Sequence, residues 1–311
     1  MASHPIASPA PAPAPSSPPT PPPVHFGKGA SIGVGLIGGS LGMVLTHEQM
    51  ADEIVGIGRR VENLKTAVAL GAIHRYVTDS QEGIRDADLI VLATPVDTYE
   101  RQVRAWRPWL HPGAIVTDVG SVKGALVERV EQLLPSGIRF VGAHPIAGRE
   151  KTGVAAGSLT LFRQARCILT PTATTDAAAL QQIRAMWEQA GSTVLTMDPH
   201  LHDRVLGAVS HLPHVVAFGL INALTEIQRR ATPEVDLLTY GGGGLRDTTR
   251  IAGSSPEMWR DICVWNKDNL VDMLGDFEEQ IRRLKHLIKN GDGVSIEREF
   301  ERAKTVRERL R

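Results

Sequence analysis

Between residues 30 and 198, short apolar runs alternate with segments of helical periodicity. Seven runs are rich in β-forming residues, and several are continuously apolar, which is typical of strands covered on both faces. The runs are Ala30–Gly33, Glu53–Ile57, Leu89–Ala93, Ala114–Val119, Phe140–Ala143, Cys167–Thr170 and Thr193–Met197, and the helical segments include Glu62–Leu70, Lys123–Leu134 and Asp176–Ala190. This alternation predicts a Rossmann-like α/β domain over residues 25–198, with a doubly wound and mostly parallel sheet.

After Asp198 the pattern becomes helical throughout. Leu201–Arg230 has helical periodicity with a kink expected at Pro213, and helices are expected to start at Thr232-Pro233-Glu234 and at Ser255-Pro256-Glu257. The last start opens a predicted helix of roughly 30 residues, nearly 50 Å long. Its apolar stripe is longer than a small domain needs for its own core. Residues 199–290 are therefore predicted to form an all-helical substrate and dimerisation domain, which makes a homodimer.

The two ends of the chain differ from the rest in composition. The first 23 residues hold ten of the twenty prolines and no Lys, Arg, Asp or Glu, so residues 1–24 are predicted to be a disordered tail rather than a secretory signal. Residues 291–311 are rich in Arg and Glu and form a charged tail, either helical or frayed.

Charge and cysteine content exclude several classes of protein. Lys+Arg and Asp+Glu are equal at 34 each, which argues against nucleic acid or an anionic membrane as a partner. No apolar run approaches the ~18 residues of a membrane span. Cys167 and Cys263 are isolated, which indicates a reducing, cytoplasmic location and no metal cluster.

A glycine-rich motif opens the α/β pattern at Gly33-Val34-Gly35-Leu36-Ile37-Gly38. In a dinucleotide site the first glycine permits a tight turn, the second lets the pyrophosphate approach, and the third lets helix and sheet pack closely. The pyrophosphate is then bound by the N–H groups at the helix start. One feature weakens the prediction, because the preceding segment, Gly27–Ile32, is not strongly apolar.

The second predicted strand ends at Gly58-Arg59-Arg60. NAD-binding sites usually have a carboxylate here for the ribose 2′-hydroxyl, whereas guanidinium groups suit a 2′-phosphate. Arg59 and Arg60 therefore favour NADP over NAD. The alternative is that they cap a loop or stack on adenine, with either cofactor accepted.

Three more segments follow predicted strands, at the edge where open α/β sheets bind ligands. Thr94-Pro95 is expected to line the nicotinamide pocket, and Ser121 and His144 lie in the other two segments. His144 is the best acid–base candidate, because histidine titrates near neutral pH. Ser121 is expected to hydrogen-bond His144 and orient it.

Six motifs in order make the sequence resemble the prephenate/arogenate dehydrogenase family over roughly residues 31–288. They are the glycine-rich motif with Gly39-Ser40, then Gly-Ser-Val-Lys-Gly (120–124), His-Pro-Ile-Ala-Gly (144–148), Ser-His-Leu-Pro-His (210–214), Thr-Pro-Glu-Val-Asp (232–236) and Met-Trp-Arg-Asp-Ile (258–262). The resemblance implies oxidative decarboxylation of prephenate or arogenate, with hydride transfer to NAD(P)+, in tyrosine biosynthesis. Aromatisation of the ring drives such a reaction.

The resemblance also implies roles for individual residues. His144 accepts the ring hydroxyl proton, and Ser121 orients His144 and contacts the cofactor. His214 and Arg250 bind the substrate, with Arg250 suited to a carboxylate. Glu150 and Asp247 belong to a charged network at the pocket mouth, and Trp259 reaches a neighbouring subunit's site.

Other interpretations of the sequence remain open at this stage. A 3-hydroxyacid-type dehydrogenase would use a lysine such as Lys267 as its acid–base group. A non-catalytic dinucleotide-binding regulator is supported only by the weak first strand. His211 and His214 lie three residues apart, but no third zinc ligand is evident, so no metal is expected. Arg149 would disfavour the arogenate ammonium group if its side chain pointed inward.

Overall fold

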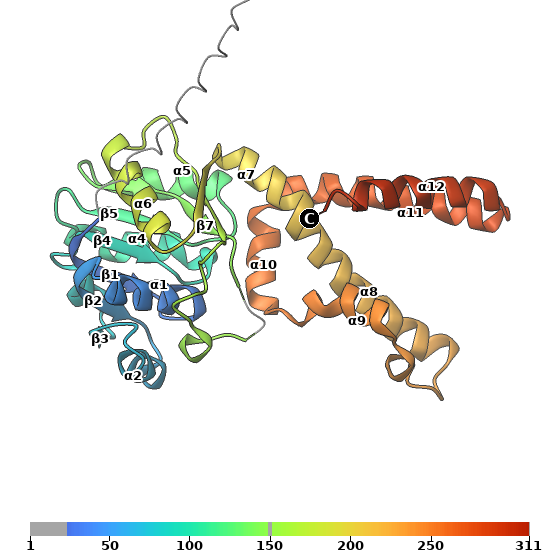
Figure 1. Cartoon of the computed structure of the whole chain (residues 1–311), viewed down its shortest axis with the longest axis horizontal. Helices are drawn as coiled ribbons and strands as arrows, with labels where there is room; N and C mark the ends of the chain where they lie inside the picture. Colours follow the sequence, from blue (N-terminus) through green and yellow to red (C-terminus); the bar gives the residue numbers. More distant parts are fainter. Residues whose placement is uncertain (1–23, 149–150, 311) are drawn as a thin grey trace, which may run out of the picture.

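The computed structural model describes residues 24–148 and 151–310 (Figure 1). Its α/β domain is built on six parallel strands in the order β3-β2-β1-β4-β5-β6. The strand order reverses between β1 and β4, which is where a dinucleotide binds in folds of this type. The strands are β1 (Phe26–Ile32), β2 (Ala51–Ile57), β3 (Arg75–Val77), β4 (Leu89–Leu92), β5 (Ile115–Asp118) and β6 (Arg139–Val141).

Helices cover both faces of this sheet and bury two separate apolar clusters. One cluster includes residues of α1 and α2, and the other includes residues of α4 and α5. The helices of this part are α1 (Leu36–His47), α2 (Val61–Ala69), α3 (Ser80–Ile84), α4 (Tyr99–Trp106) and α5 (Gly124–Leu133). The predicted doubly wound fold is confirmed.

The first strand is longer and better packed than its composition indicates. β1 begins at Phe26 and pairs with both β2 and β4. Its glycines lie where side chains would collide: a Cβ at Gly27 would be 2.8 Å from Asp88 Oδ2, and one at Gly29 would be 2.7 Å from Ile54 Cδ1. Close packing against neighbouring side chains therefore explains the low apolar content of this strand.

A second, three-stranded sheet extends the α/β domain. It consists of β7 (Ala143–Pro145), β8 (Arg166–Leu169) and β9 (Thr193–Thr196), with α6 (Ala177–Gln189) before the last strand. The run predicted as one strand, Phe140–Ala143, is divided at Gly142 between the two sheets. Gly142 has no room for a side chain, because a Cβ there would lie 2.5 Å from Thr170 Oγ1.

The helical domain follows Asp198 and projects from the α/β domain as two arms (Figure 1). α8 and α9 lie along one arm, and α11 and α12 lie along the other. The helices are α7 (Pro199–Leu206), α8 (Leu212–Ala231), α9 (Gly243–Thr249), α10 (Pro256–Trp265), α11 (Lys267–Lys289) and α12 (Gly293–Arg307), with 3₁₀ turns at Leu237–Tyr240 and Arg250–Gly253. The charged segment after residue 290 thus forms a helix.

Two helix predictions for this domain are wrong. The single long helix expected from Ser255 is two helices that meet at Asn266, whose side chain bonds the backbone of Asp203 instead of facing solvent. No helix starts at Thr232-Pro233-Glu234, because a turn from Thr232 to Val235 ends α8 there. Near the kink expected at Pro213, the helix contains a π-helical segment, Gly207–His211.

One helical run within the described residues, Pro199–Ala231, is long and apolar enough to cross a membrane by length and composition alone. It begins with buried polar residues, His202 and Asp203, and much of the rest is exposed in the single chain. A helix that covers a second protein surface has the same composition, so this property does not by itself indicate a membrane.

Candidate active site

The glycine motif connects β1 to α1, and each glycine has a different environment. Gly33 has a φ of +96°, and a Cβ there would lie 2.6 Å from the carbonyl oxygen of Ala93. A Cβ at Gly38 would collide with the carbonyl oxygen of Gly33 and lie 2.8 Å from Ala93 Cβ. Gly35 differs, because no described atom lies within 4 Å of the position of its Cβ. The loop is therefore tight on one side and open on the other.

The open side is the start of α1, where Leu36 and Ile37 form the first turn. Gly35 is the N-cap and supplies no side-chain hydrogen bond. Unpaired N–H groups and the positive end of the helix dipole favour a phosphate at such a position. The geometry around Gly35 therefore suits the pyrophosphate of a dinucleotide.

The end of β2 carries the two predicted arginines. Gly58 follows the strand directly, and Arg59 and Arg60 are exposed, with Arg60 at the N-cap of α2. Both arginines follow the strand end near which the adenosine ribose binds in folds of this type.

The Thr94-Pro95 segment follows β4, next to the glycine loop. Thr94 Oγ1 is 2.8 Å from Thr98 Oγ1 and accepts a hydrogen bond of 2.9 Å from Gln102 Nε2. Pro95 is exposed, and its carbonyl accepts from the Thr98 hydroxyl at 2.7 Å. These bonds hold in place the segment that the sequence predicts to line the nicotinamide pocket.

The loop after β5 is fixed by a buried ion pair that the sequence analysis did not identify. Lys123 Nζ lies 2.8 Å from Asp118 Oδ2 and also donates to the carbonyl of Gly120 at 2.5 Å. Asp118 accepts further hydrogen bonds from the backbone N–H groups of Gly120 and Ala143. A pair that is fully hydrogen-bonded in this way tolerates burial. It ties the loop that carries Ser121 to the strand that carries His144.

His144 lies on β7 with only 7% of its surface exposed. Its Nδ1 is 2.9 Å from Nε2 of His202, and Nδ1 of His202 is 2.8 Å from Oδ1 of Asp203. Burial lowers the pKa of His144 well below 6.5, and the nearby His202 and Lys123 side chains lower it further. His144 is therefore neutral near pH 7 and able to accept a proton.

Ser121 is half-buried in the loop after β5. Among the described residues, the hydrogen-bond partner of the His144 ring is His202 rather than the predicted partner, Ser121. The backbone of Ser121 bonds His211, whose Nδ1 lies 3.0 Å from Asn266 Nδ2. Ser121 is thus linked to the helical domain through His211.

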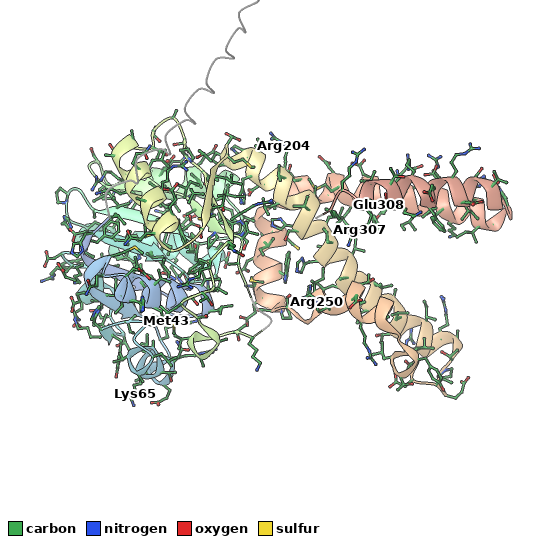
Figure 2. All side chains as sticks on the ribbon, in the orientation of Figure 1. Met43, Lys65, Arg204, Arg250, Arg307 and Glu308 are labelled. Carbon is green, nitrogen blue, oxygen red and sulfur yellow. The ribbon has the colours of Figure 1, made fainter. Side chains whose placement is uncertain are left out.

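His214 and Arg250 lie together in the helical domain. The ring of His214 stacks on Trp259 with the centroids 3.8 Å apart, and its Nδ1 is 2.8 Å from the carbonyl oxygen of Ser210. Burial lowers the pKa of His214, and the positive charge of Arg250 contributes to the same shift. Figure 2 shows Arg250 between α10 and α8, within the helical domain.

The structure also places the remaining candidates. Asp247 is exposed on α9, in the arm that points away from the α/β domain (Figure 1). Glu150 and Arg149 lie outside the described residues. Trp259 is buried in its own chain, against His214 and His211. Lys267 is exposed at the start of α11, so nothing in its surroundings supports an acid–base role.

His202, Asp203, Asn266 and the Asp118–Lys123 pair are the site residues that sequence reasoning missed. Two of them carry a recognisable signal: His202 and Asp203 are adjacent polar residues near the start of a helical run that is largely apolar beyond them. Polar groups that a helix buries need partners in the fold, and here the partners are His144 and the start of α5.

Comparison with known proteins identifies both domains. Residues 41–196 match the nucleotide-binding domain of prephenate dehydrogenase, and residues 198–302 match its dimerization domain. The chain is 36% identical to the prephenate dehydrogenase of Bacillus subtilis (strain 168) over 89% of its length and 74% of that protein. It is 35% identical to the cyclohexadienyl dehydrogenase of Zymomonas mobilis over 89% of its length and 94% of that protein.

A solved structure agrees with these matches. The prephenate dehydrogenase of A. aeolicus, in complex with hydroxyphenyl propionate and NAD+, superposes with a TM-score of 0.85 at 38% identity. The match covers 93% of this chain and 99% of that one. The chain described here therefore belongs to the prephenate dehydrogenase family.

Proposed function

We propose that this protein oxidatively decarboxylates prephenate, arogenate or both, with hydride transfer to NAD(P)+, as a step of tyrosine biosynthesis. The oxidoreductase function expected from the sequence is confirmed by membership of the family. The observation that carries the proposed mechanism is the buried His144, which lies on β7 just after the end of β6 and is held by His202. When NAD(P)+ is bound, its nicotinamide ring supplies the hydride acceptor. The open space at Gly35 suits the pyrophosphate of the same dinucleotide.

The protein's own groups perform the proton transfer and the orientation of the substrate. Nε2 of His144 accepts the proton of the ring hydroxyl as hydride leaves the carbon that bears this hydroxyl. The opposite carboxylate leaves as CO2, and the ring becomes aromatic. Ser121 contacts the cofactor through its hydroxyl, while Thr94 and Pro95 line the nicotinamide pocket. Thr94 and Pro95 lie in the loop after β4, and Ser121 lies in the loop after β5, which agrees with these roles.

The helical domain supplies the groups that bind the substrate. Because the pKa of His214 is lowered, this histidine is neutral at pH 7 and acts as a hydrogen-bonding group. The positive charge that a dianionic substrate needs therefore comes from Arg250, whose planar fork suits a carboxylate. The roles of Glu150 and Asp247 at the pocket mouth stay predictions.

We also propose that NADP is preferred over NAD. Support comes from Gly58, which provides no carboxylate at the end of β2, and from the exposed Arg59 and Arg60 that follow it. A ribose 2′-phosphate would pair with these guanidinium groups.

A homodimer through the helical domain is the proposed assembly. The matched dimerization domain covers residues 198–302, and large apolar side chains are exposed along α11 and α12 and at Ile227 of α8. A cytoplasmic location is proposed on the two free cysteines, Cys167 and Cys263.

The test of this function is an absorbance assay for the reduced nicotinamide, with prephenate or arogenate and with NAD or NADP. Turnover in at least one of the four combinations is expected, and the best combination fixes substrate and cofactor together. Folded protein that binds NADP(H) but turns over neither substrate would contradict the proposed function.

A further inference from the structure

We propose that His202 and Asp203 are positioning residues that fix which ring nitrogen of His144 accepts the substrate proton. The three side chains form a continuous line of hydrogen bonds, from Asp203 Oδ1 through both nitrogens of His202 to Nδ1 of His144. This inference rests on the proposed role of His144 as the general base.

The direction of each hydrogen bond follows from the carboxylate at one end. An ionised carboxylate only accepts, so Nδ1 of His202 carries a proton and donates it to Asp203. In a neutral imidazole the other nitrogen is then an acceptor, so Nε2 of His202 accepts from Nδ1–H of His144. Nε2 of His144 is left with a free lone pair, which is the form that a general base requires.

The charge of Asp203 is itself held in place by the α/β domain. Oδ1 of Asp203 accepts a 2.8 Å hydrogen bond from the backbone N–H of Lys123, one residue before α5. A Cβ at Gly124 would lie 2.8 Å from Oδ2 of Asp203, so the start of α5 packs directly on the carboxylate. The N-terminal end of a helix favours a negative charge.

The same line of bonds stabilises the charge that forms during the reaction. When Nε2 of His144 takes the hydroxyl proton, its Nδ1 proton can pass to Nε2 of His202. The positive charge then lies on the ring beside Asp203. The other charged or titratable groups facing the two rings are Lys123, His211 and Asp118. Lys123 and His211 oppose a positive charge here, which leaves Asp203 as the group in direct contact that favours it.

Three substitutions, one of them a control, test this line of hydrogen bonds from Asp203 through His202 to His144, which we call the relay. His202→Phe keeps a ring in the buried space but removes both nitrogens, and it should lower kcat by roughly 10²–10⁴-fold with KM changed little. In His202→Gln the amide oxygen can still accept from Nδ1–H of His144, so this variant should recover at least about tenfold of the lost kcat. His200→Gln is the matched control, because His200 is exposed on the same helix and bonds Glu128; its kcat should equal that of the wild type.

Asp203→Asn separates positioning from simple packing. The amide oxygen can keep both hydrogen bonds, but the negative charge that raises the pKa of His202 is lost. The acid limb of the kcat/KM profile should therefore move to lower pH, and the plateau should fall. A purely structural role would leave that limb where it is. Melting temperatures and NADP(H) binding report whether each variant is folded.

The outcomes distinguish this proposal from the proposed function. If His144→Asn keeps its kcat, the role of His144 is wrong. If His144→Asn is inactive while His202→Phe and Asp203→Asn keep both kcat and the acid limb of the wild type, only the relay is wrong. In the His144→Asn background, Asp203→Asn should cause no further loss of kcat, because a relay has no effect once its base is removed.

Discussion

The two domains differ in how much of their apolar surface they bury within one chain. Helix α5 of the α/β domain buries five of its ten residues. Helix α8 of the helical domain buries only Ala217 among twenty residues, and α11 buries only Leu270 among twenty-three. The α/β domain therefore has a core that one chain completes, whereas the helical domain needs a second surface. Catalysis and assembly should consequently respond to different substitutions.

The largest expected effect tests whether the chemistry depends on the edge of the α/β domain. His144→Asn should lower kcat by roughly 10²–10⁴-fold, which is typical for loss of a general base, without changing cofactor binding or oligomeric state. Steady-state kinetics, NADP(H) titration and analytical ultracentrifugation measure these three quantities. A variant with near-normal kcat would remove His144 from the mechanism.

The pH profile of the wild-type enzyme extends this test. The pKa of His144 lies well below 6.5. The neutral base is therefore present above that pKa and is lost as the pH falls through it. The acid limb of kcat/KM that belongs to His144 should lie below pH 6.5. A limb above pH 7 that disappears in His144→Asn would contradict the direction of this shift.

The next effect tests the helical domain as an interface. Val271 and Ile288 are 67% and 63% exposed on α11. Changing both to Glu should weaken the dimer at least ~100-fold, since placing charges in an apolar interface costs about 3 kcal/mol or more. Analytical ultracentrifugation measures the assembly. Val68→Glu on α2 is the matched control, because Val68 is an exposed apolar residue of the other domain.

A smaller effect is expected where the helical domain binds the substrate. Arg250→Ala should raise KM by about 10–100-fold and change kcat little, because a charged hydrogen bond contributes about 1.5–3 kcal/mol. Steady-state kinetics with the preferred substrate provide the measurement. A fall in kcat alone would mean that Arg250 acts in the transition state instead.

The smallest effect concerns cofactor choice. Arg59→Ala with Arg60→Ala should weaken NADP binding about tenfold or more and leave NAD binding nearly unchanged, since only the 2′-phosphate needs the two charges. Titration with each cofactor measures the ratio. Equal losses for both cofactors would show that these arginines do not bind the 2′-phosphate.

Local pattern was sufficient to predict most strands of the two sheets, the glycine loop and the starts of several helices. Asp176 and Ser255 cap α6 and α10 as expected, because capping depends on neighbours three residues away. The break at Asn266 could not be predicted in this way. It depends on a hydrogen bond to the backbone of Asp203, 63 residues earlier in the sequence.

The site shows the same limit. His144 was identifiable from its chemistry and its place after a strand, but its partner His202 lies 58 residues away on a different element. Ser121 was predicted to hydrogen-bond His144 through its hydroxyl. The contact that the described residues show is instead a hydrogen bond between the Ser121 backbone and His211. Pattern within a segment finds reactive groups, whereas their orientation depends on contacts that only the fold creates.

The π-helical segment at Gly207–His211 bears on how the chain can change in length at this point. A π turn holds about one residue more than an α turn within the same full rotation, whereas one residue of a regular α-helix rotates everything after it by about 100°. Deleting a single residue from the π segment would therefore give a regular helix from α7 into α8, with His202 and His214 on nearly the same faces as before. The same deletion in the regular turn between Asp203 and Gly207 would instead rotate His214 and the exposed side chains of α8 by about 100° relative to His202. The π segment is thus the point at which this helical run can change its length with the least effect on substrate binding and dimer formation.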